Sequence, residues 1–157
     1  HVTDGVAMAK KYRLPSRVID FIREHHGTGI TRYQYNKAVS ETDDPDSIDI
    51  ADFTYPGPSP RSKETALVML ADGTEARARS NSPRTDEEIM SVVEDAINAT
   101  KNSGQLDQTD LTLKDLNTIK QSFFNTLKQS YHPRIKYPEA RPATQPIAIE
   151  DKNLNPQ

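Results

Sequence analysis

The sequence predicts an all-α fold, and two observations support that prediction. Apolar residues recur with the three- and four-residue spacing of a helix face in five segments of the chain. In addition, 34% of the residues are hydrophobic, 27% are charged and none is tryptophan. Sandwiches and barrels depend on aromatic and β-branched strands, so this composition fits a polar, mainly helical protein better. We expect one domain built around one core.

We expect two short helices at the start of the chain. The first covers residues 1–12, and the residues of its apolar side are Val2, Val6 and Ala9. Pro15 suits the first turn of the second helix, and apolar residues at helical spacing continue from there to His25. Gly27 stands where a left-handed cap is expected, so the adjacent His25 and His26 close this helix.

Between Gly27 and Ser62 the helical pattern weakens, and we expect a long functional loop. It begins with a short helix over residues 31–39, followed by an acidic stretch over residues 41–49. A cluster of turn residues, Pro and Gly among them, covers residues 55–60.

Two longer helices are expected next. The first covers residues 62–80, and its stretch 65–76 is apolar on nearly every side, which predicts a central, buried helix. Thr85 and Glu88 have capping-box spacing and predict the start of the second helix, which ends near Gly104.

The last helix carries the strongest periodic pattern in the chain. It starts at Thr112, and its apolar stripe consists of Leu113, Leu116, Ile119, Phe123, Leu127 and Tyr131. We expect Leu70, Ile119 and Phe123 to be buried in one core. Residues 141–157 include three prolines and offer too little apolar surface to offset the entropy of ordering, so we expect a flexible tail there.

Charge and composition exclude several classes of protein. The net charge of −3 includes no extended excess of Lys and Arg, so a DNA or RNA duplex is not an expected partner, whereas a small anionic ligand is compatible. The absence of cysteine excludes disulfides and Cys-based zinc sites. No apolar run approaches the roughly 20 residues of a membrane helix. Because the chain opens on His1 without an initiator methionine, we expect it to be a piece of a longer protein.

Three of the four histidines lie within the first 26 residues, and two of them are adjacent. Imidazole is a common metal ligand, and at a fraying helix end the rings of His25 and His26 could both turn toward one ion. The alternative is that both are solvated cations favoured by the negative end of the helix dipole. Spacing alone leaves both interpretations open.

Asp72 lies inside the stretch that is predicted to be buried. A carboxylate in such surroundings must be paired, protonated or bound to a cation. A metal ion is one partner that would satisfy it. An ion pair with Arg77, Lys63 or a residue of another helix is the alternative, and the single residue does not distinguish them.

Five short strings stand in the order in which one protein family carries them. They are HHGT at 25–28, YPGP at 55–58, SKETA at 62–66, MLAD at 69–72 and HPRIKYP at 132–138. On these strings the chain resembles the intracellular HD domain of seven-transmembrane receptor hydrolases of the PgpH type, which are HD-type metal-dependent phosphohydrolases. We therefore expect residues 1–140 to form the C-terminal part of an HD-domain helical bundle.

The resemblance implies hydrolysis of a cyclic dinucleotide, cyclic di-AMP, to linear pApA at two divalent ions of iron or manganese. His1, His25 and His26 resemble the histidines that hold one ion, and Asp72 resembles the late aspartate that binds the other and serves catalysis. Paired cations can generate a hydroxide nucleophile and neutralise phosphoryl oxygens. The parent protein would be membrane-anchored, with this domain on the cytoplasmic face of the cell membrane.

Cations and flat side chains would be needed for the phosphates and adenines of such a substrate. Arg32, Tyr33, Tyr35 and Lys37 could supply charge and stacking, and Lys63 could reach a phosphate. The alternative for each is ordinary: a tyrosine packed at the surface, or a solvated cation.

The chain departs from the family in one respect, because it contains no His-Asp dipeptide. The family's His-Asp pair lies upstream of the position that corresponds to His1, so we expect the chain alone to be inactive and the missing ligands to precede it. A second hypothesis is a non-catalytic sensor module that uses a degenerate HD scaffold to bind a nucleotide or partner. An HD enzyme of nucleoside phosphates is disfavoured, since the later strings match the membrane-anchored group.

Overall fold

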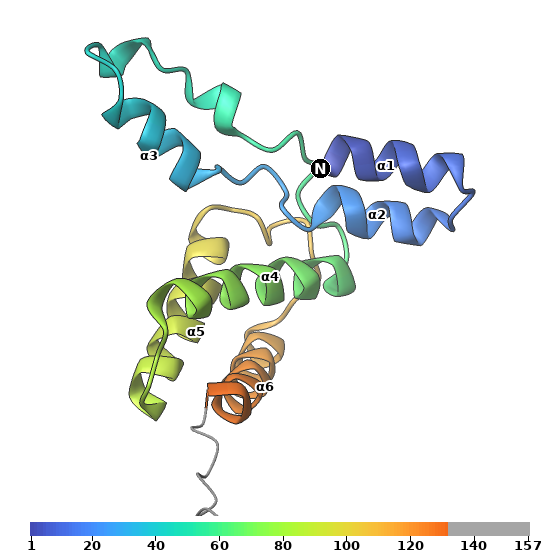
Figure 1. Ribbon diagram of the computed structural model, residues 1–157. Helices are drawn as coiled ribbons and strands as arrows, with labels where there is room; N and C mark the ends of the chain where they lie inside the picture. The colour runs from blue at the N-terminus through green and yellow to red at the C-terminus, as the bar shows by residue number, and fades with distance from the viewer. Residues whose placement is uncertain (132–157) are drawn as a thin grey trace, which may run out of the picture.

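The structure of the protein is a computed structural model that describes residues 1–131 (Figure 1). Within this range the only β-type pairing is an isolated bridge between Ile30 and Thr54, so the predicted all-α class is confirmed. The elements are α1 (Val2–Lys11), α2 (Ser16–Glu24), α3 (Arg32–Ser40), the 3₁₀ helices η1 (Pro45–Ser47) and η2 (Ile50–Phe53), α4 (Lys63–Asn81), α5 (Asp86–Asn102) and α6 (Leu113–Tyr131). The string at 132–138 and the predicted tail at 141–157 lie outside the described residues.

The helices form two groups that meet where α2 contacts α4. α1 and α2 pack side by side, and α4, α5 and α6 contact one another in the larger group (Figure 1). α3 contacts η2, and Figure 1 shows that α3 and the 3₁₀ helices after it extend away from the other helices. The segment expected as a long loop therefore contains one α-helix and two 3₁₀ helices. None of the described helices has the length and apolarity needed to cross a bilayer.

Local signals in the sequence define where the two central helices begin. The Ser62 hydroxyl accepts a hydrogen bond from the Thr65 backbone N–H at 3.3 Å and caps α4. The predicted capping box of α5 is present, because Thr85 accepts the Glu88 N–H and Glu88 accepts the Thr85 N–H, both at 3.2 Å. Gly104 follows α5 with a φ of 72°, a left-handed conformation that glycine adopts without steric cost.

The hydrophobic core lies between α4, α5 and the segment that follows α5. Its buried members are Ala66, Leu70, Val93, Ile97 and Leu106, of which the first three have no exposed surface. Leu70 has no exposed surface, as predicted from the apolar stretch of its helix. Side chains of α6 then cover one side of this core.

The prediction that Ile119 and Phe123 are buried in one core with Leu70 is confirmed only in part. Both side chains pack against the core, but they remain half-buried, and no residue of α6 within the described range is fully buried. Leu113, the first residue of the predicted stripe, is 76% exposed. The physical reason is that α6 contacts α4 and α5 along one edge of the group, so its apolar stripe is covered from one side only.

The prediction that α4 is buried on nearly all sides is wrong. Leu67 and Val68 are 41% and 39% exposed, and the side chain of Asp72 is 48% exposed. In the described residues α5, α6 and α2 cover one face of α4, and its apolar residues on the other side stay accessible. Asp72 is therefore not an isolated carboxylate in an apolar interior.

A carboxylate that is fully buried lies instead at the contact between α2 and α4. Glu24 is 2% exposed and accepts hydrogen bonds from Thr65 and Arg61. Burial by itself raises the pKa of the Glu24 carboxyl, but the hydrogen bonds from Thr65 and Arg61 outweigh that effect. The pKa of Glu24 is consequently below its ordinary value, and the side chain is an anion inside the helix contact.

Candidate metal centre

His1, His25 and His26 come together at one end of the α1–α2 pair. Each offers a ring nitrogen, and the three nitrogens lie within 4.8 Å of one another. The Nε2 atoms of His1 and His26 are 3.0 Å apart, and the rings of His25 and His26 lie with centroids 4.0 Å apart. The structure thus brings together the three histidines that the sequence singled out.

The antiparallel packing of α1 and α2 explains how His1 reaches a pair that is 24 and 25 residues away. His1 is the N-cap residue of α1, and His25 is the C-cap residue of α2, so the start of one helix meets the end of the other. Gly5 permits the close approach, because a Cβ atom there would lie 2.9 Å from Cγ2 of Ile22. The cluster is therefore a product of helix pairing.

The backbone of α2 determines which nitrogen of the neutral His25 ring carries the hydrogen. Its Nδ1 lies 2.9 Å from the carbonyl oxygen of Ile22 and 3.1 Å from that of Phe21. A carbonyl oxygen can only accept, so Nδ1 carries the proton and donates it. In the neutral ring Nε2 then keeps its lone pair, which is the form that binds a metal ion.

His26 lies between the other histidines, a carboxylate and an aromatic ring. Its Nδ1 is 3.5 Å from Oδ2 of Asp72, and its ring stacks on Tyr55 with centroids 4.2 Å apart. Burial and then the neighbouring His25 lower the pKa of His26, and Asp72 only partly offsets this. Burial, followed by the charge of Asp72, raises the pKa of the Tyr55 hydroxyl. The environment of His26 favours a neutral imidazole, the state in which a histidine binds metal.

Gly27 allows the chain to turn directly after the histidine pair. Its φ is 52°, and a Cβ atom at this position would meet Oε1 of Gln105 and Cε of Met69. Gln105 accepts the Thr28 backbone N–H at 3.0 Å and donates from Nε2 to the Thr28 hydroxyl at 2.9 Å. The turn after α2 is therefore joined to the segment that follows α5.

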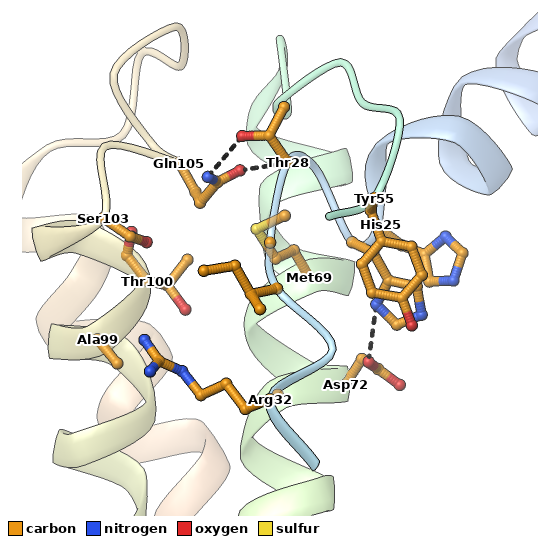
Figure 2. A pocket seen from close by; sticks show the side chains of 14 residues that line it. His25, Thr28, Arg32, Tyr55, Met69, Asp72, Ala99, Thr100, Ser103 and Gln105 are labelled. Carbon is orange, nitrogen blue, oxygen red and sulfur yellow. Dashed lines mark hydrogen bonds and ion pairs between the residues drawn. The ribbon is translucent and has the colours of Figure 1, made fainter. Parts of the chain in front are cut away.

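The histidine pair and Asp72 line an open cavity of about 470 Å³ (Figure 2). That volume is within the range of small-molecule sites, about 300–1,000 Å³. Figure 2 shows Tyr55, His25 and Asp72 on one side, and on the other Ala99 and Thr100 of α5 with Ser103, the residue that follows this helix. The remaining lining residues are His26, Thr28, Gly29, Ile30, Arg32, Met69, Gly73 and Gln105.

The residues predicted to bind substrate occupy different places. Arg32 lines the cavity and faces it with its guanidinium group (Figure 2). Tyr33 is exposed, and Tyr35 packs edge-on against Phe53 with ring centroids 5.6 Å apart. The ammonium of Lys37 lies 3.8 Å from the carboxylate of Glu41, the residue that follows α3, in an ion pair. Among these four, only Arg32 lies on the cavity wall.

Lys63 lies apart from the histidine cluster, at the contact between α4 and α6. Its ammonium group donates to Oδ2 of Asp115 at 2.9 Å. The Thr112 backbone N–H, followed by the Lys63 ammonium, lowers the pKa of Asp115 to about 2. The structure does not bring Lys63 together with the residues of the cavity.

Three features of the site had no prediction from the sequence. Tyr55 stacks on His26, Gln105 binds the turn after the histidine pair, and Thr100 and Ser103 form the far wall of the cavity. Tyr55 stands in one of the strings that carry the family resemblance, which was the one available signal. The polar residues after and within α5 carry no motif, and only the fold places them beside the histidines.

A helical domain in which clustered histidines and an aspartate line one cavity has the features of an HD-type phosphohydrolase domain. The comparisons identify the relatives within that class. The chain is 40% identical over 140 residues to the cyclic-di-AMP phosphodiesterase PgpH of Bacillus subtilis, and 35% identical over 139 residues to the PgpH of Listeria monocytogenes. These alignments cover 89% and 88% of this chain but 19% of each relative.

A solved structure agrees with these relatives. The HD domain of L. monocytogenes PgpH in complex with cyclic-di-AMP superimposes with a TM-score of 0.77 and 32% identity. The match covers 87% of this chain and 63% of that domain. No protein-family model matches the sequence. The chain is thus homologous to part of the HD domain of the PgpH proteins, and the resemblance found in the sequence is confirmed.

Proposed function

We propose that the chain is part of an HD domain that hydrolyses cyclic di-AMP to linear pApA in a metal-dependent reaction. One observation supports this most strongly: three histidines converge, and two of them, His25 and His26, line a cavity of small-molecule size together with Asp72. The relatives at 35% and 40% identity are cyclic-di-AMP phosphodiesterases, and the similar solved domain has cyclic-di-AMP bound. The resemblance also supports a membrane-anchored parent protein with this domain on the cytoplasmic face.

The chemistry of the donor set fits a divalent ion such as iron or manganese. Imidazole suits both metals, and His25 presents a free Nε2 because its Nδ1 donates to the backbone. The Nε2 atoms of His1 and His26 lie 3.0 Å apart, close enough for both to reach one ion. We assign His1, His25 and His26 to one ion and Asp72 to its neighbour.

Bound divalent cations supply activation of water for attack on phosphorus and neutralise the charge of the phosphate. The chain's own residues position the reacting groups. Tyr55 stacks on His26 and limits the rotation of its ring. Asp72 lies 3.5 Å from Nδ1 of His26, the ring nitrogen that does not face His1. The guanidinium of Arg32 lines the same cavity, where it is suited to bind a phosphate through two parallel hydrogen bonds.

The metal assignment predicts where ions bind in the complete HD domain. In crystals grown with manganese, anomalous scattering should show one ion within bonding distance of His1, His25 and His26 and a second at Asp72. The expectation follows from the convergence of the three ring nitrogens within 4.8 Å. Manganese found away from all four side chains would refute the assignment.

The activity itself is tested with the complete HD domain, cyclic di-AMP and added manganese or iron. We expect linear pApA as the product, loss of hydrolysis after metal removal with a chelator, and recovery on adding manganese. Cyclic di-GMP serves as the matched control for selectivity. A domain that binds cyclic di-AMP but never cleaves it with either metal would support the alternative hypothesis, a non-catalytic nucleotide sensor on the HD scaffold.

A further inference from the structure

The carboxylate of Glu24 accepts hydrogen bonds from Arg61, which precedes α4, and from Thr65 in the first turn of α4. Oε1 accepts from Nε and Nη2 of Arg61 at 2.9 and 2.8 Å, and Oε2 accepts from the Arg61 backbone N–H at 3.0 Å. The Thr65 hydroxyl donates to Oε2 at 2.7 Å. Glu24 and Thr65 are 2% and 0% exposed, so the hydrogen bond between them is shielded from water, whereas the Arg61 side chain is 51% exposed.

One face of α4 contacts three consecutive parts of the chain at the end of α2. Thr65, Met69 and Asp72 have the i, i+4 and i+7 spacing of a single helix face. Thr65 bonds Glu24, Met69 lies against Gly27, and Asp72 lies 3.5 Å from His26. The Glu24 contact is therefore the first of three along a line that ends at the candidate metal centre.

A second polar contact connects α2 to the start of α4, and it lies nearer the start of α2. Arg17 donates from Nη2 to the Ser62 hydroxyl at 2.6 Å and to the Glu64 carboxylate at 2.8 Å. These partners are exposed, and exposed ion pairs contribute little to stability. The buried Glu24 contact is thus the stronger constraint on how the end of α2 sits on α4.

Glu24 directly precedes His25, and its anionic side chain is costly to bury for stability alone. Desolvating a carboxylate costs several kcal/mol, and a well-packed apolar side chain would often serve stability as well. An apolar side chain would not fix the orientation of α2 on α4. The two oxygens of Glu24 do so, because hydrogen bonds are directional and four donors from Arg61 and Thr65 bind them. Among the residues that the structure describes, Glu24 makes no hydrogen bond to a histidine, so it acts on the histidine pair through the backbone that joins it to His25.

From this geometry we infer that Glu24 is a positioning residue that holds the histidine pair at the end of α2 in register with Asp72 on α4, so that metal ions can be bound between the two helices. The inference rests on the metal centre of the proposed function. Its test is metal binding, which does not depend on the identity of the substrate.

The experiment measures the affinity of the metal-free complete HD domain for Mn²⁺ by calorimetry, at a temperature where circular dichroism shows every variant folded. Glu24→Gln keeps the size of the side chain but places an amide N–H₂ against donors. We expect it to weaken Mn²⁺ binding about 10-fold, the lower end of the range for residues that bond a metal ligand directly, because Glu24 acts through the placement of α2 on α4. Thr65→Val removes one donor at equal volume and should weaken binding less, about several-fold.

Glu94→Gln is the matched control. Glu94 pairs with Lys120 at 3.0 Å between α5 and α6, and its loss should leave the Mn²⁺ affinity unchanged. The inference is overturned if Glu24→Gln and Thr65→Val melt at lower temperature yet bind Mn²⁺ like the unchanged domain, since Glu24 would then be structural only.

The failure of the proposed function gives a different result. An unchanged domain that binds Mn²⁺ but does not cleave cyclic di-AMP would refute the activity, while the comparison of variants would still decide the role of Glu24. An unchanged domain that binds no Mn²⁺ would overturn both proposals.

Discussion

Replacing Asp72 by alanine in the complete HD domain is expected to abolish most hydrolysis of cyclic di-AMP, with a loss of about 100-fold or more. The carboxylate lines the cavity and lies 3.5 Å from Nδ1 of His26, at the place where α4 meets the end of α2. The variant loses the proposed ligand of one ion, so elemental analysis should also show lower metal occupancy. Turnover is measured with manganese in excess.

The matched control for this variant is Glu75→Ala. Glu75 is a carboxylate three residues further along the same helix, it is exposed, and it pairs with Arg79 at 3.4 Å rather than with the histidines. Its removal should leave turnover and metal content close to those of the unchanged domain. Equal turnover in the Asp72→Ala variant and the unchanged domain would refute the role of Asp72.

Replacing Leu70 by alanine is expected to lower the free energy of unfolding by about 2–5 kcal/mol. Leu70 has no exposed surface and packs in the cluster that joins α4 to α5. The substitution removes buried apolar atoms and leaves a cavity that the neighbours fill only in part. Urea denaturation followed by circular dichroism measures the change. The dependence of the unfolding free energy on urea concentration should be the same in the variant and the unchanged domain.

Leu67→Ala is the control within the same helix. Leu67 is 41% exposed, so the same loss of atoms removes less buried surface and should cost less than about 1 kcal/mol. A similar loss of stability in both variants would contradict the one-sided burial of α4. A small effect at Leu70 would show that the core lies elsewhere.

The ends of the helices could be predicted from the sequence because they depend on near neighbours. The Thr85 and Glu88 capping box, the left-handed Gly27 after α2 and the helical spacing of apolar residues each involve residues a few positions apart. Burial could be predicted less well. The apolar stretch of α4 and the stripe of α6 identify helices, but how many sides of each helix are covered depends on which helices pack there.

The candidate site divides in the same way. The sequence by itself determined the helical class, the adjacent His25 and His26 at a helix end, and the family resemblance that pointed to His1 and Asp72. These are properties of local spacing and of residue order, and both can be read from a linear chain.

Only the tertiary structure decided which of these side chains meet. The antiparallel pairing of α1 and α2 brings Nε2 of His1 to 3.0 Å from that of His26, and the packing of α2 on α4 places Asp72 beside the same ring. It also separates Lys63 from the cavity and adds Tyr55 to it. Contacts between residues far apart in the chain are set by the packing of helix faces, because the spacing within each helix fixes only which side chains share a face and not which helix they meet.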